Sequence, residues 1–180
     1  MSHSPIRILT QSDPALLQVL KLIQESFAFM TGRIDPPSSM HRLTLQDLTE
    51  KAQTDWILGM GDPVKACAVA SPRHHALYLG KVAVDPSLRG QGMARALVQA
   101  CEGIAVDLGL DRLELQVRIE LVENQNAFAN MGFVKTAEND HPGYNRVTEI
   151  TMQKNFVMDS FTLRVKSICA FLLAWFCPAS

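Results

Sequence analysis

A strand that runs through a glycine turn into a helix is the feature that most constrains the fold. The segment from Ala76 to Val84 is rich in β-branched and aromatic residues, which indicates a strand, and Asp85-Pro86 ends it. After the turn, apolar residues at helical spacing predict a helix that stops at Gly109. The first turn of a helix has backbone N–H groups without partners and the positive end of the helix dipole. This order of elements therefore suits the binding of a phosphate group.

The turn itself, Ser87 to Arg95, carries the residues that a diphosphate needs. Gly90 and Gly92 lack the Cβ that would keep a phosphate away, and Arg89 adds charge-assisted hydrogen bonds. A Walker loop is excluded because no lysine followed by serine or threonine stands here, and a dinucleotide fingerprint is excluded because its third glycine is Arg95. A tight turn with an exposed arginine stays the alternative.

The remaining chain up to residue 155 alternates strand-like and helix-like segments, which predicts a single α/β (α+β) domain over residues 1–155. Further strands are expected over residues 6–9, 55–60, 64–71, 112–118, 133–137 and 145–154. Helices are expected from Pro14 to near Gly32, from Thr44 to about Lys51, and over Glu123–Phe128. Gly61-Asp62-Pro63 marks a turn, so the second and third of these strands are expected to form a hairpin.

Arg89, Gly92 and Ala94 fill the three defined positions of Q/R-x-x-G-x-G/A, so the turn resembles the signature of the GNAT superfamily of acyl-CoA-dependent N-acyltransferases. The resemblance extends over residues 5–155 in the order of the elements, and Gly132-Phe133 ends the short helix as is usual in that family. It implies a mixed, mainly antiparallel central sheet flanked by helices. It also implies an enzyme that transfers an acetyl group from acetyl-CoA to a primary amine within a ternary complex.

The same resemblance implies where acetyl-CoA binds. The pantetheine arm is expected along the backbone of Val82, Ala83 and Val84, with an N–H of this strand polarising the thioester carbonyl. The residues expected to hold the pyrophosphate are Arg89, Gly90, Gln91, Gly92, Met93, Ala94 and Arg95. Asn124 is expected to bond CoA or the adjoining strand. Gly80 marks either the bulge that separates two central strands in the family or a packing glycine.

The usual acid of the family is missing from its usual place. Many members have a tyrosine four residues before the Gly-Phe pair, whereas this chain has Phe128, which is expected to pack beside the pantetheine or in the core. Tyr144 is the first candidate to protonate the leaving thiolate, and protonation by solvent is the alternative. His141 and Glu114 are candidate bases, although a solvated histidine and a polar residue at the sheet margin are the simpler interpretations.

Acceptor specificity in the family rests on two loops, which here are the first acceptor loop (Met30–Ser39) and the second acceptor loop (Asn139–Asn145). Asp35 is a candidate for attracting a cationic amine, and His141 is a candidate substrate-binding residue. Arg118 is expected either to hold a substrate carboxylate or to pair with a glutamate nearby. A protein or peptide acetyltransferase, acting on an N-terminus or a lysine, and a non-catalytic acyl-CoA-binding module remain as alternatives to an enzyme that acetylates a small amine.

The amino-acid composition limits the kinds of partner that the protein is expected to bind. With 17 Lys and Arg against 18 Asp and Glu, bulk positive charge for holding nucleic acid is absent. The four cysteines include no C-x-x-C pair, so no metal site is expected. The start of the chain has no signal-peptide pattern, which favours a cytoplasmic location.

The segment 156–180 is a composition shift toward hydrophobic residues, and its longest apolar run is too short to span a membrane. Its helical spacing predicts an amphipathic helix that docks on the domain or on a second subunit of a homodimer. A membrane-surface or aggregation-prone tail is the alternative.

Overall fold

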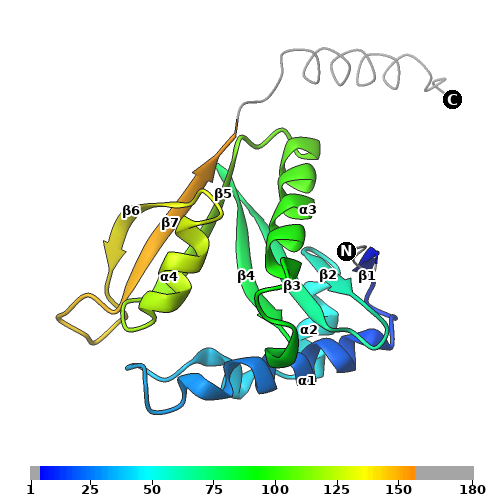
Figure 1. Cartoon of the computed structure of the whole chain (residues 1–180), viewed down its shortest axis with the longest axis horizontal. Coiled ribbons are helices and arrows are strands. Elements are labelled where there is room, and N and C mark those ends of the chain that lie inside the picture. The colour runs from blue at the N-terminus through cyan, green and yellow to red at the C-terminus, as the bar shows by residue number, and fades with distance from the viewer. Residues whose placement is uncertain (1–4, 157–180) are drawn as a thin grey trace, which may run out of the picture.

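The computed structural model describes residues 5–156. Apart from Phe156, the hydrophobic helix predicted over residues 156–180 lies outside the described residues. Within them, seven strands form one sheet in the order β1-β2-β3-β4-β5-β7-β6 (Figure 1). The strands are β1 (Ile6–Leu9), β2 (Trp56–Met60), β3 (Ala66–Arg73), β4 (Ala76–Val84), β5 (Arg112–Arg118), β6 (Val134–Asn139) and β7 (Glu149–Asn155). The α-helices are α1 (Ala15–Phe27), α2 (Leu45–Lys51), α3 (Met93–Asp107) and α4 (Val122–Ala129). Three 3₁₀ turns are η1 (Ala28–Met30), η2 (Ser39–Arg42) and η3 (Pro86–Leu88).

The two central strands of the sheet separate from each other. β4 and β5 run parallel and pair only at Leu77 with Leu113 and at Tyr78 with Glu114, while the other strand pairs of the described chain are antiparallel. A register shift against β3 places an extra residue in β4 just after Gly80, where Lys81 has a φ of 52°. The irregularity at this position agrees with the bulge that the sequence left open, and beyond Tyr78 β4 offers an unpaired edge toward β5.

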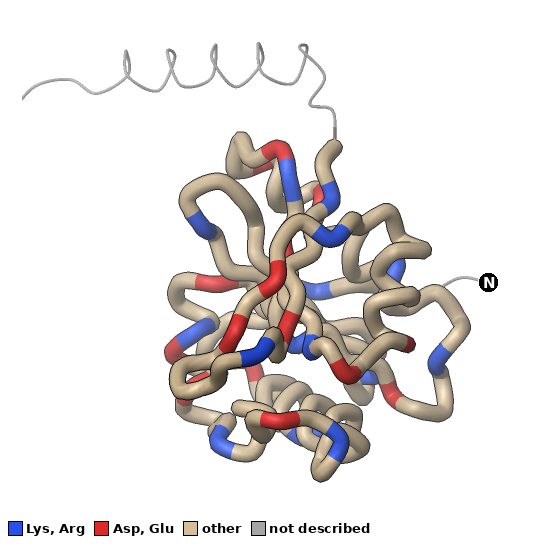
Figure 2. The backbone as a smooth tube through the Cα atoms, turned by 90° about the vertical axis from the view of Figure 1, so that its left-hand side faces the viewer, with Lys and Arg blue, Asp and Glu red and all other residues tan. Residues whose placement is uncertain are grey.

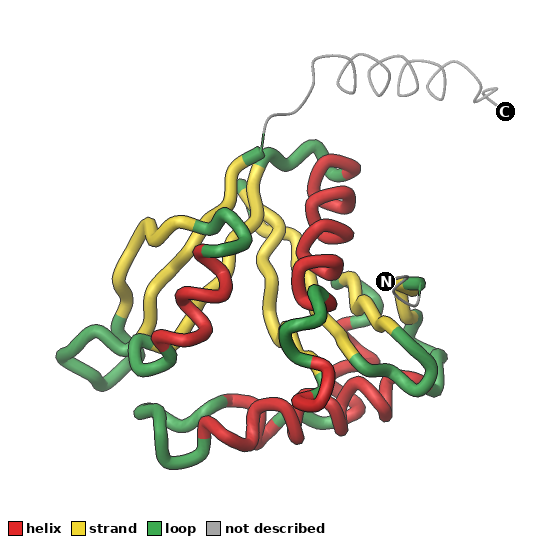
Figure 3. Tube along the Cα trace, viewed as in Figure 1, coloured by secondary structure: helices red, strands yellow, loops and turns green. Residues whose placement is uncertain are grey.

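Helices cover both faces of the sheet and so bury two hydrophobic clusters (Figure 3). On one face, Leu97, Val98 and Cys101 of α3 pack against inward-facing residues of β2 to β5 and β7. On the other face, Leu16, Val19 and Ile23 of α1 pack with Leu48 of α2 against β2 and β3. The alternation of side chains along each strand supplies both faces with apolar residues. This two-sided cover holds the separated strands in place.

The element boundaries differ most from the sequence prediction at the end of the first helix and at the start of the last strand. The first helix is α-helical only to Phe27 and continues as η1 to Met30, whereas the sequence predicted a helix to Gly32. Leu17 of this helix is 59% exposed, because the buried face follows Leu16, Val19 and Ile23. The last strand begins at Glu149 instead of 145, since residues 140–148 continue the loop. The start after Thr44 is confirmed, as Thr44 and Asp47 form a capping box there.

None of the helices formed by residues 5–156 is long and apolar enough to cross a membrane.

Candidate active site

The turn before α3 is built from left-handed glycines and a capped 3₁₀ turn. Gly90 and Gly92 have φ angles of 78° and 83°, values that side-chain-bearing residues rarely adopt. Asp85 caps η3 by accepting hydrogen bonds from the backbone N–H and the hydroxyl of Ser87. The backbone hydrogen bond that begins the helix runs from the N–H of Ala96 to the carbonyl of Gly92, at 3.0 Å. The preceding N–H groups of the first turn are thereby left for an anion.

Charged side chains around this turn are anchored to the body of the protein. Arg89 donates to the carbonyl of Ser26 at 3.2 Å, and Arg95 donates to the carbonyl of Asn130 at 3.0 Å. Hydrogen bonds from Ser87, together with the Lys65 ammonium at 3.1 Å, lower the pKa of Asp85 to about 2. The residues predicted to hold the pyrophosphate thus lie together at the N-terminal end of α3, and Arg89 and Arg95 are the first and last of them.

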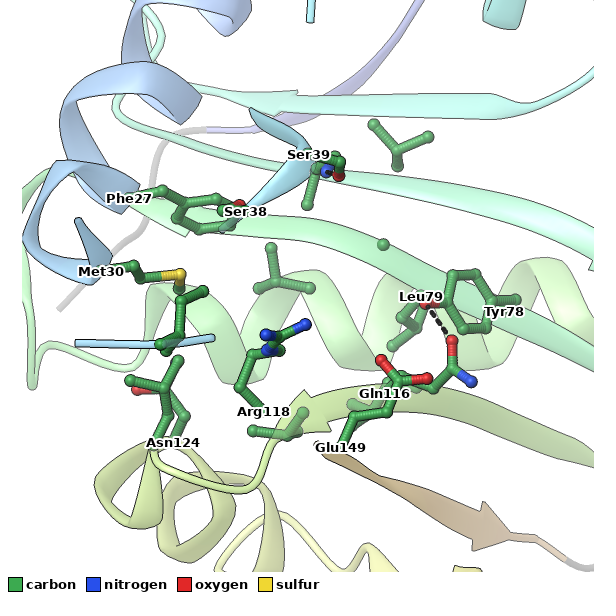
Figure 4. A pocket seen from close by; sticks show the side chains of 18 of the residues that line it. Phe27, Met30, Ser38, Ser39, Tyr78, Leu79, Gln116, Arg118, Asn124 and Glu149 are labelled. Carbon is green, nitrogen blue, oxygen red and sulfur yellow. Dashed lines mark hydrogen bonds between the residues drawn. The ribbon is translucent and has the colours of Figure 1, made fainter. Parts of the chain in front are cut away.

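A cavity of about 520 Å³ lies where β4 and β5 separate. Figure 4 shows side chains from α1, η1, β4, β5, α4 and β7 directed into it. Val82, Asn124, Phe128 and His141, four residues that the sequence singled out, line this cavity. The cavity reaches the first acceptor loop through Ile34 and residues 36–39. The separation of the strands therefore brings the expected pantetheine strand and the first acceptor loop to the same space.

Phe128 occupies the place of the usual family tyrosine and has apolar surroundings. Its ring makes an edge-to-face contact with Phe133, with the centroids 5.7 Å apart. It also packs against the larger hydrophobic cluster while lining the cavity. A phenyl ring can shape the cavity, but it has no proton to transfer.

Arg118, His141 and Glu149 form a polar group on the cavity wall. Arg118 and Glu149 are opposite each other in the β5–β7 ladder, and His141 Nε2 lies 2.8 Å from Arg118 Nη1 and 3.7 Å from Glu149 Oε2. Arg118 Nη1 also lies 3.4 Å from His141 Nδ1, and Nδ1 itself lies 2.6 Å from the hydroxyl oxygen of Thr148. Both ring nitrogens of His141 therefore already have partners within the protein.

Two further polar residues come from the strands. Tyr78 donates to Gln116 Oε1 at 3.2 Å, and both residues line the cavity (Figure 4). Burial raises the pKa of Tyr78, which keeps the phenol protonated. Glu114 does not line the cavity; it accepts from Arg73 at 3.1 Å and from Gln153 at 3.0 Å. Its role as a base stays a prediction, and its observed partners fit a polar residue at the sheet margin.

Tyr144 and Asp35 lie together but outside the residues that line the cavity. The Tyr144 hydroxyl donates to Asp35 Oδ1 at 2.6 Å, and Arg146 donates to Asp35 Oδ2 at 2.9 Å. The bond to Tyr144, followed by that to Arg146, lowers the pKa of Asp35, and the bond to Asp35 raises the pKa of Tyr144. The two acceptor loops are thus joined directly, and the catalytic role of Tyr144 stays a prediction.

The sequence interpretation missed Glu149 and Lys81. Glu149 is the carboxylate-bearing residue among the described residues that line the cavity, and its side chain is 18% exposed. Glu149 is the first residue of β7, so a correct placement of the start of this strand would have put it next to the second acceptor loop. Lys81 is at the bulge, lines the cavity and donates to the Ser39 hydroxyl at 3.1 Å. Burial and the neighbouring Lys51 lower the pKa of Lys81.

Charges elsewhere are mixed in sign. Figure 2 shows basic and acidic residues interspersed along the backbone. Within the part of the chain that the structure describes, no group of three or more His, Cys, Asp or Glu side chains is placed to hold a metal ion.

The model of the acetyltransferase (GNAT) family matches residues 17–133. No curated protein sequence matches the chain. Among solved structures, the chain is similar to the ribosomal-protein-S18-alanine N-acetyltransferase from Escherichia coli, with 18% identity over 87% of this chain and 96% of that chain and a TM-score of 0.63.

Two more structures show the same likeness. The PaiA N-acetyltransferase from Thermoplasma acidophilum, solved in complex with coenzyme A, has 18% identity over 87% of this chain and 100% of that chain, with a TM-score of 0.67. The ribosomal-protein-S5-alanine acetyltransferase from Vibrio fischeri has 17% identity over 89% and 96% of the two chains, with a TM-score of 0.63. At these identities the likeness establishes the fold: a mixed, mainly antiparallel sheet flanked by helices.

Proposed function

Because the chain belongs to the GNAT acetyltransferase family, we propose that it is an N-acetyltransferase that moves an acetyl group from acetyl-CoA directly to a small primary amine. The observation that carries this proposal is the cavity at the separation of β4 and β5. It extends from the strand next to the phosphate-binding turn to the first acceptor loop. A donor and an acceptor that enter from these two sides would meet inside it.

For the donor, the chain provides a backbone cradle and an unpaired strand edge. The first-turn N–H groups of α3 would hold the pyrophosphate, with Gly90 and Gly92 allowing close approach. The edge of β4 at Val82 to Val84, which does not pair with β5, would bind the pantetheine amides as an added strand. An N–H of that edge would polarise the thioester carbonyl, and the backbone would not need to rearrange because the strand already fixes it.

For the acceptor, the chain must supply a neutral amine. A lysine-like amine has a pKa of about 10.4, so its neutral form at pH 7 costs roughly 4 to 5 kcal/mol. Glu149 is the carboxylate on the cavity among the described residues, so we assign it the removal of the ammonium proton, directly or through a water molecule. His141 is less suited, because both of its ring nitrogens already have partners, Arg118 and Thr148.

The transfer forms one N–C bond and breaks one C–S bond. The products are an acetamide, the free thiol of CoA and one proton that leaves through the base. Phe128 cannot protonate the thiolate, and the low basicity of a thiolate near neutral pH allows solvent to do so. Phe128 instead contributes an apolar ring to the cavity wall.

The first acceptor loop favours a small amine over a peptide. Arg118 donates to the carbonyl of Pro36, and Asp35 binds Tyr144 and Arg146, so this loop is held across to β5 and to the second acceptor loop. A loop fixed across the acceptor side leaves a bounded pocket, whereas an extended peptide needs an open groove. Two structural relatives are named as acetyltransferases of an alanine in a ribosomal protein. The experiment below therefore includes peptides among the acceptors.

The test is to incubate the full chain with acetyl-CoA and a panel of small amines and short peptides. Thiol release is followed together with the mass of each acetylated product. We expect one free thiol for each acetylated small amine, and we expect Gly92→Trp to abolish both while circular dichroism shows a retained fold.

The contrary outcomes are distinct. Absence of CoA binding would contradict the proposed donor site. CoA binding without any turnover across the panel would favour the non-catalytic module, and acetylation of peptides alone would favour the protein acetyltransferase.

A further inference from the structure

The charged side chains on the cavity wall are predominantly basic. Among the described lining residues, the cationic ones are Arg42, Lys51, Lys81 and Arg118, and the one carboxylate is Glu149. With His141 left out of the count, these side chains carry three more positive than negative charges. A cavity that needs only to attract an ammonium group would be expected to have the opposite balance.

Two of the four cations are already compensated within the protein. Lys51 Nζ lies 3.2 Å from Asp55 Oδ2. Arg118 donates to the carbonyl of Pro36 and to His141, and its Nε lies 4.0 Å from Glu120 Oε2. These contacts within the protein are sufficient to explain the presence of both side chains.

Lys81 and Arg42 have no such compensation. Within residues 5–156, no carboxylate lies at ion-pair distance from either side chain, and the recorded partner of the Lys81 ammonium is the Ser39 hydroxyl at 3.1 Å. Lys81 is partly buried and Arg42 is exposed, and the pKa of Lys81 is lowered first by burial and then by Lys51. A partly buried cation beside a second cation is unfavourable unless an anion joins it.

The opposite charge is on the other side of the cavity. Figure 4 shows Ser39, the partner of Lys81, and Glu149 on opposite sides of the cavity, with Arg118 between them. An acceptor with an ammonium group at one end and an anionic group at the other would be matched by this arrangement.

We propose that the acceptor amine also carries an anionic group, a carboxylate or a phosphate, which Lys81 and Arg42 bind while the amine faces Glu149. This inference rests on the proposed function, because it names the substrate class of the same site. Ser38 and Ser39, which line the cavity next to these cations, supply hydroxyl donors to the same anion.

The experiment compares acceptors that differ only in this anion. Amino acids are assayed beside their carboxamides, and O-phosphoethanolamine is assayed beside ethanolamine, with kcat/KM expressed per neutral amine. We expect the anionic member to be preferred by about tenfold or more, as for a charge-assisted hydrogen bond. Preference for the amino acid or for the phosphate identifies the kind of anion.

Variants connect the preference to the two side chains. Lys81→Met and Arg42→Gln should each remove most of the preference for the anion and leave the affinity for CoA unchanged. Lys21→Met is the matched control, since Lys21 lies exposed on α1 and pairs with Glu25, and it should keep the full preference. Weaker CoA binding by Lys81→Met would overturn the proposal, because the cations would then serve the donor.

A binding measurement separates this inference from the proposed function. The same amine pairs are titrated by calorimetry into the CoA-saturated protein and, separately, into the free protein. Tighter binding of the anionic member that is lost in Lys81→Met supports the anion site even if no acetyl transfer occurs. Acetylation of amines with equal kcat/KM and equal affinity for both members would overturn the anion site and leave the transferase intact.

Discussion

Glu149 is the residue on which the proposed chemistry depends most directly. Replacing it by glutamine keeps the size of the side chain but removes its ability to accept a proton. We expect Glu149→Gln to lower kcat by about 100-fold, a typical contribution of a general base, with the dissociation constant of acetyl-CoA unchanged. The activity of the variant should recover toward high pH, where more of the amine is neutral without help. Steady-state kinetics across a pH series measures both effects.

The same measurement on Glu114→Gln decides between the two carboxylates. Glu114 is held by Arg73 and Gln153 away from the cavity, so its loss should leave the pH profile in place. A large fall in kcat for Glu114→Gln, with none for Glu149→Gln, would restore the base that the sequence suggested.

The electrostatics of a single residue, Asp85, affect the stability of the glycine turn before α3. Its pKa is lowered to about 2 in the folded protein, first by hydrogen bonds from Ser87 and then by Lys65, against an ordinary value of 3.8. A carboxyl group with a depressed pKa stabilises the fold above the unfolded pKa, and this contribution is lost as the pH falls from about 4 to about 2.

Asp85→Asn should therefore be less stable than the wild type at pH 6, and the difference in unfolding free energy should shrink as the pH is lowered to 2. Urea denaturation at several pH values measures this difference. A gap that stays constant with pH would show that the carboxylate charge has no part in holding the turn.

At the scale of elements, the two ends of α3 offer a matched pair of glycines. Gly90 before the helix and Gly109 after it have φ angles of 78° and 75°, and a Cβ added at either would meet no atom within 4 Å. Alanine at each position should cost about the same, roughly 1 kcal/mol, since the cost comes from the left-handed backbone alone.

Only Gly90→Ala should weaken CoA binding, because its methyl group enters the proposed pyrophosphate cradle. Thermal unfolding gives the shared cost, and calorimetry with CoA gives the difference, which we expect to be tenfold or more. Equal CoA affinities for the two variants would place the pyrophosphate elsewhere.

What the sequence could predict of these elements depended on how local their signals were. The strand at Ala76–Val84 and the glycine turn were predictable because β-branched residues, Asp85-Pro86 and the glycines act on their own neighbours. The end of α1 was predicted too late because its last turn changes to 3₁₀ geometry with no glycine or proline to mark the change.

The cavity was less accessible to prediction. Lys81 enters it through a bulge whose register depends on pairing with β3, and Glu149 enters it from a strand nearly 70 residues farther along the chain. Pairings between distant segments leave little trace in one sequence. Asn124 and Phe128 could be placed at the site only because the family resemblance assigned them.

At the scale of the whole molecule, the separated sheet has two parts that are joined near the acceptor side by the acceptor loops. Arg33 of the first loop pairs with Glu123 at 2.7 Å, and Asp35 bonds Tyr144 and Arg146 of the far part. These contacts cross from the β1–β4 side of the sheet to the β5–β7 side. We infer that they fix the width of the acceptor side of the cavity.

This arrangement gives Tyr144 two distinguishable roles. As an acid for the leaving thiolate, it would be needed in the chemical step, and Tyr144→Phe would lower kcat. As one half of a bond between the acceptor loops, it would act only together with Asp35. We expect the second behaviour: Tyr144→Phe and Asp35→Asn should each raise KM for the acceptor by about three- to tenfold, as for loss of one hydrogen bond to a charged group, with kcat nearly unchanged.

The double variant settles the matter, because two residues that share one bond are not additive. Tyr144→Phe combined with Asp35→Asn should raise KM little beyond Asp35→Asn alone, which also removes the charge that Arg146 binds. Arg33 makes a separate contact between the two parts of the sheet through its ion pair with Glu123. The effect of Arg33→Gln on KM should therefore add to that of Tyr144→Phe. A fall in kcat confined to Tyr144→Phe, with Asp35→Asn behaving as wild type, would instead make Tyr144 the acid and would mean that the loop opens during the reaction to bring the phenol to the sulfur.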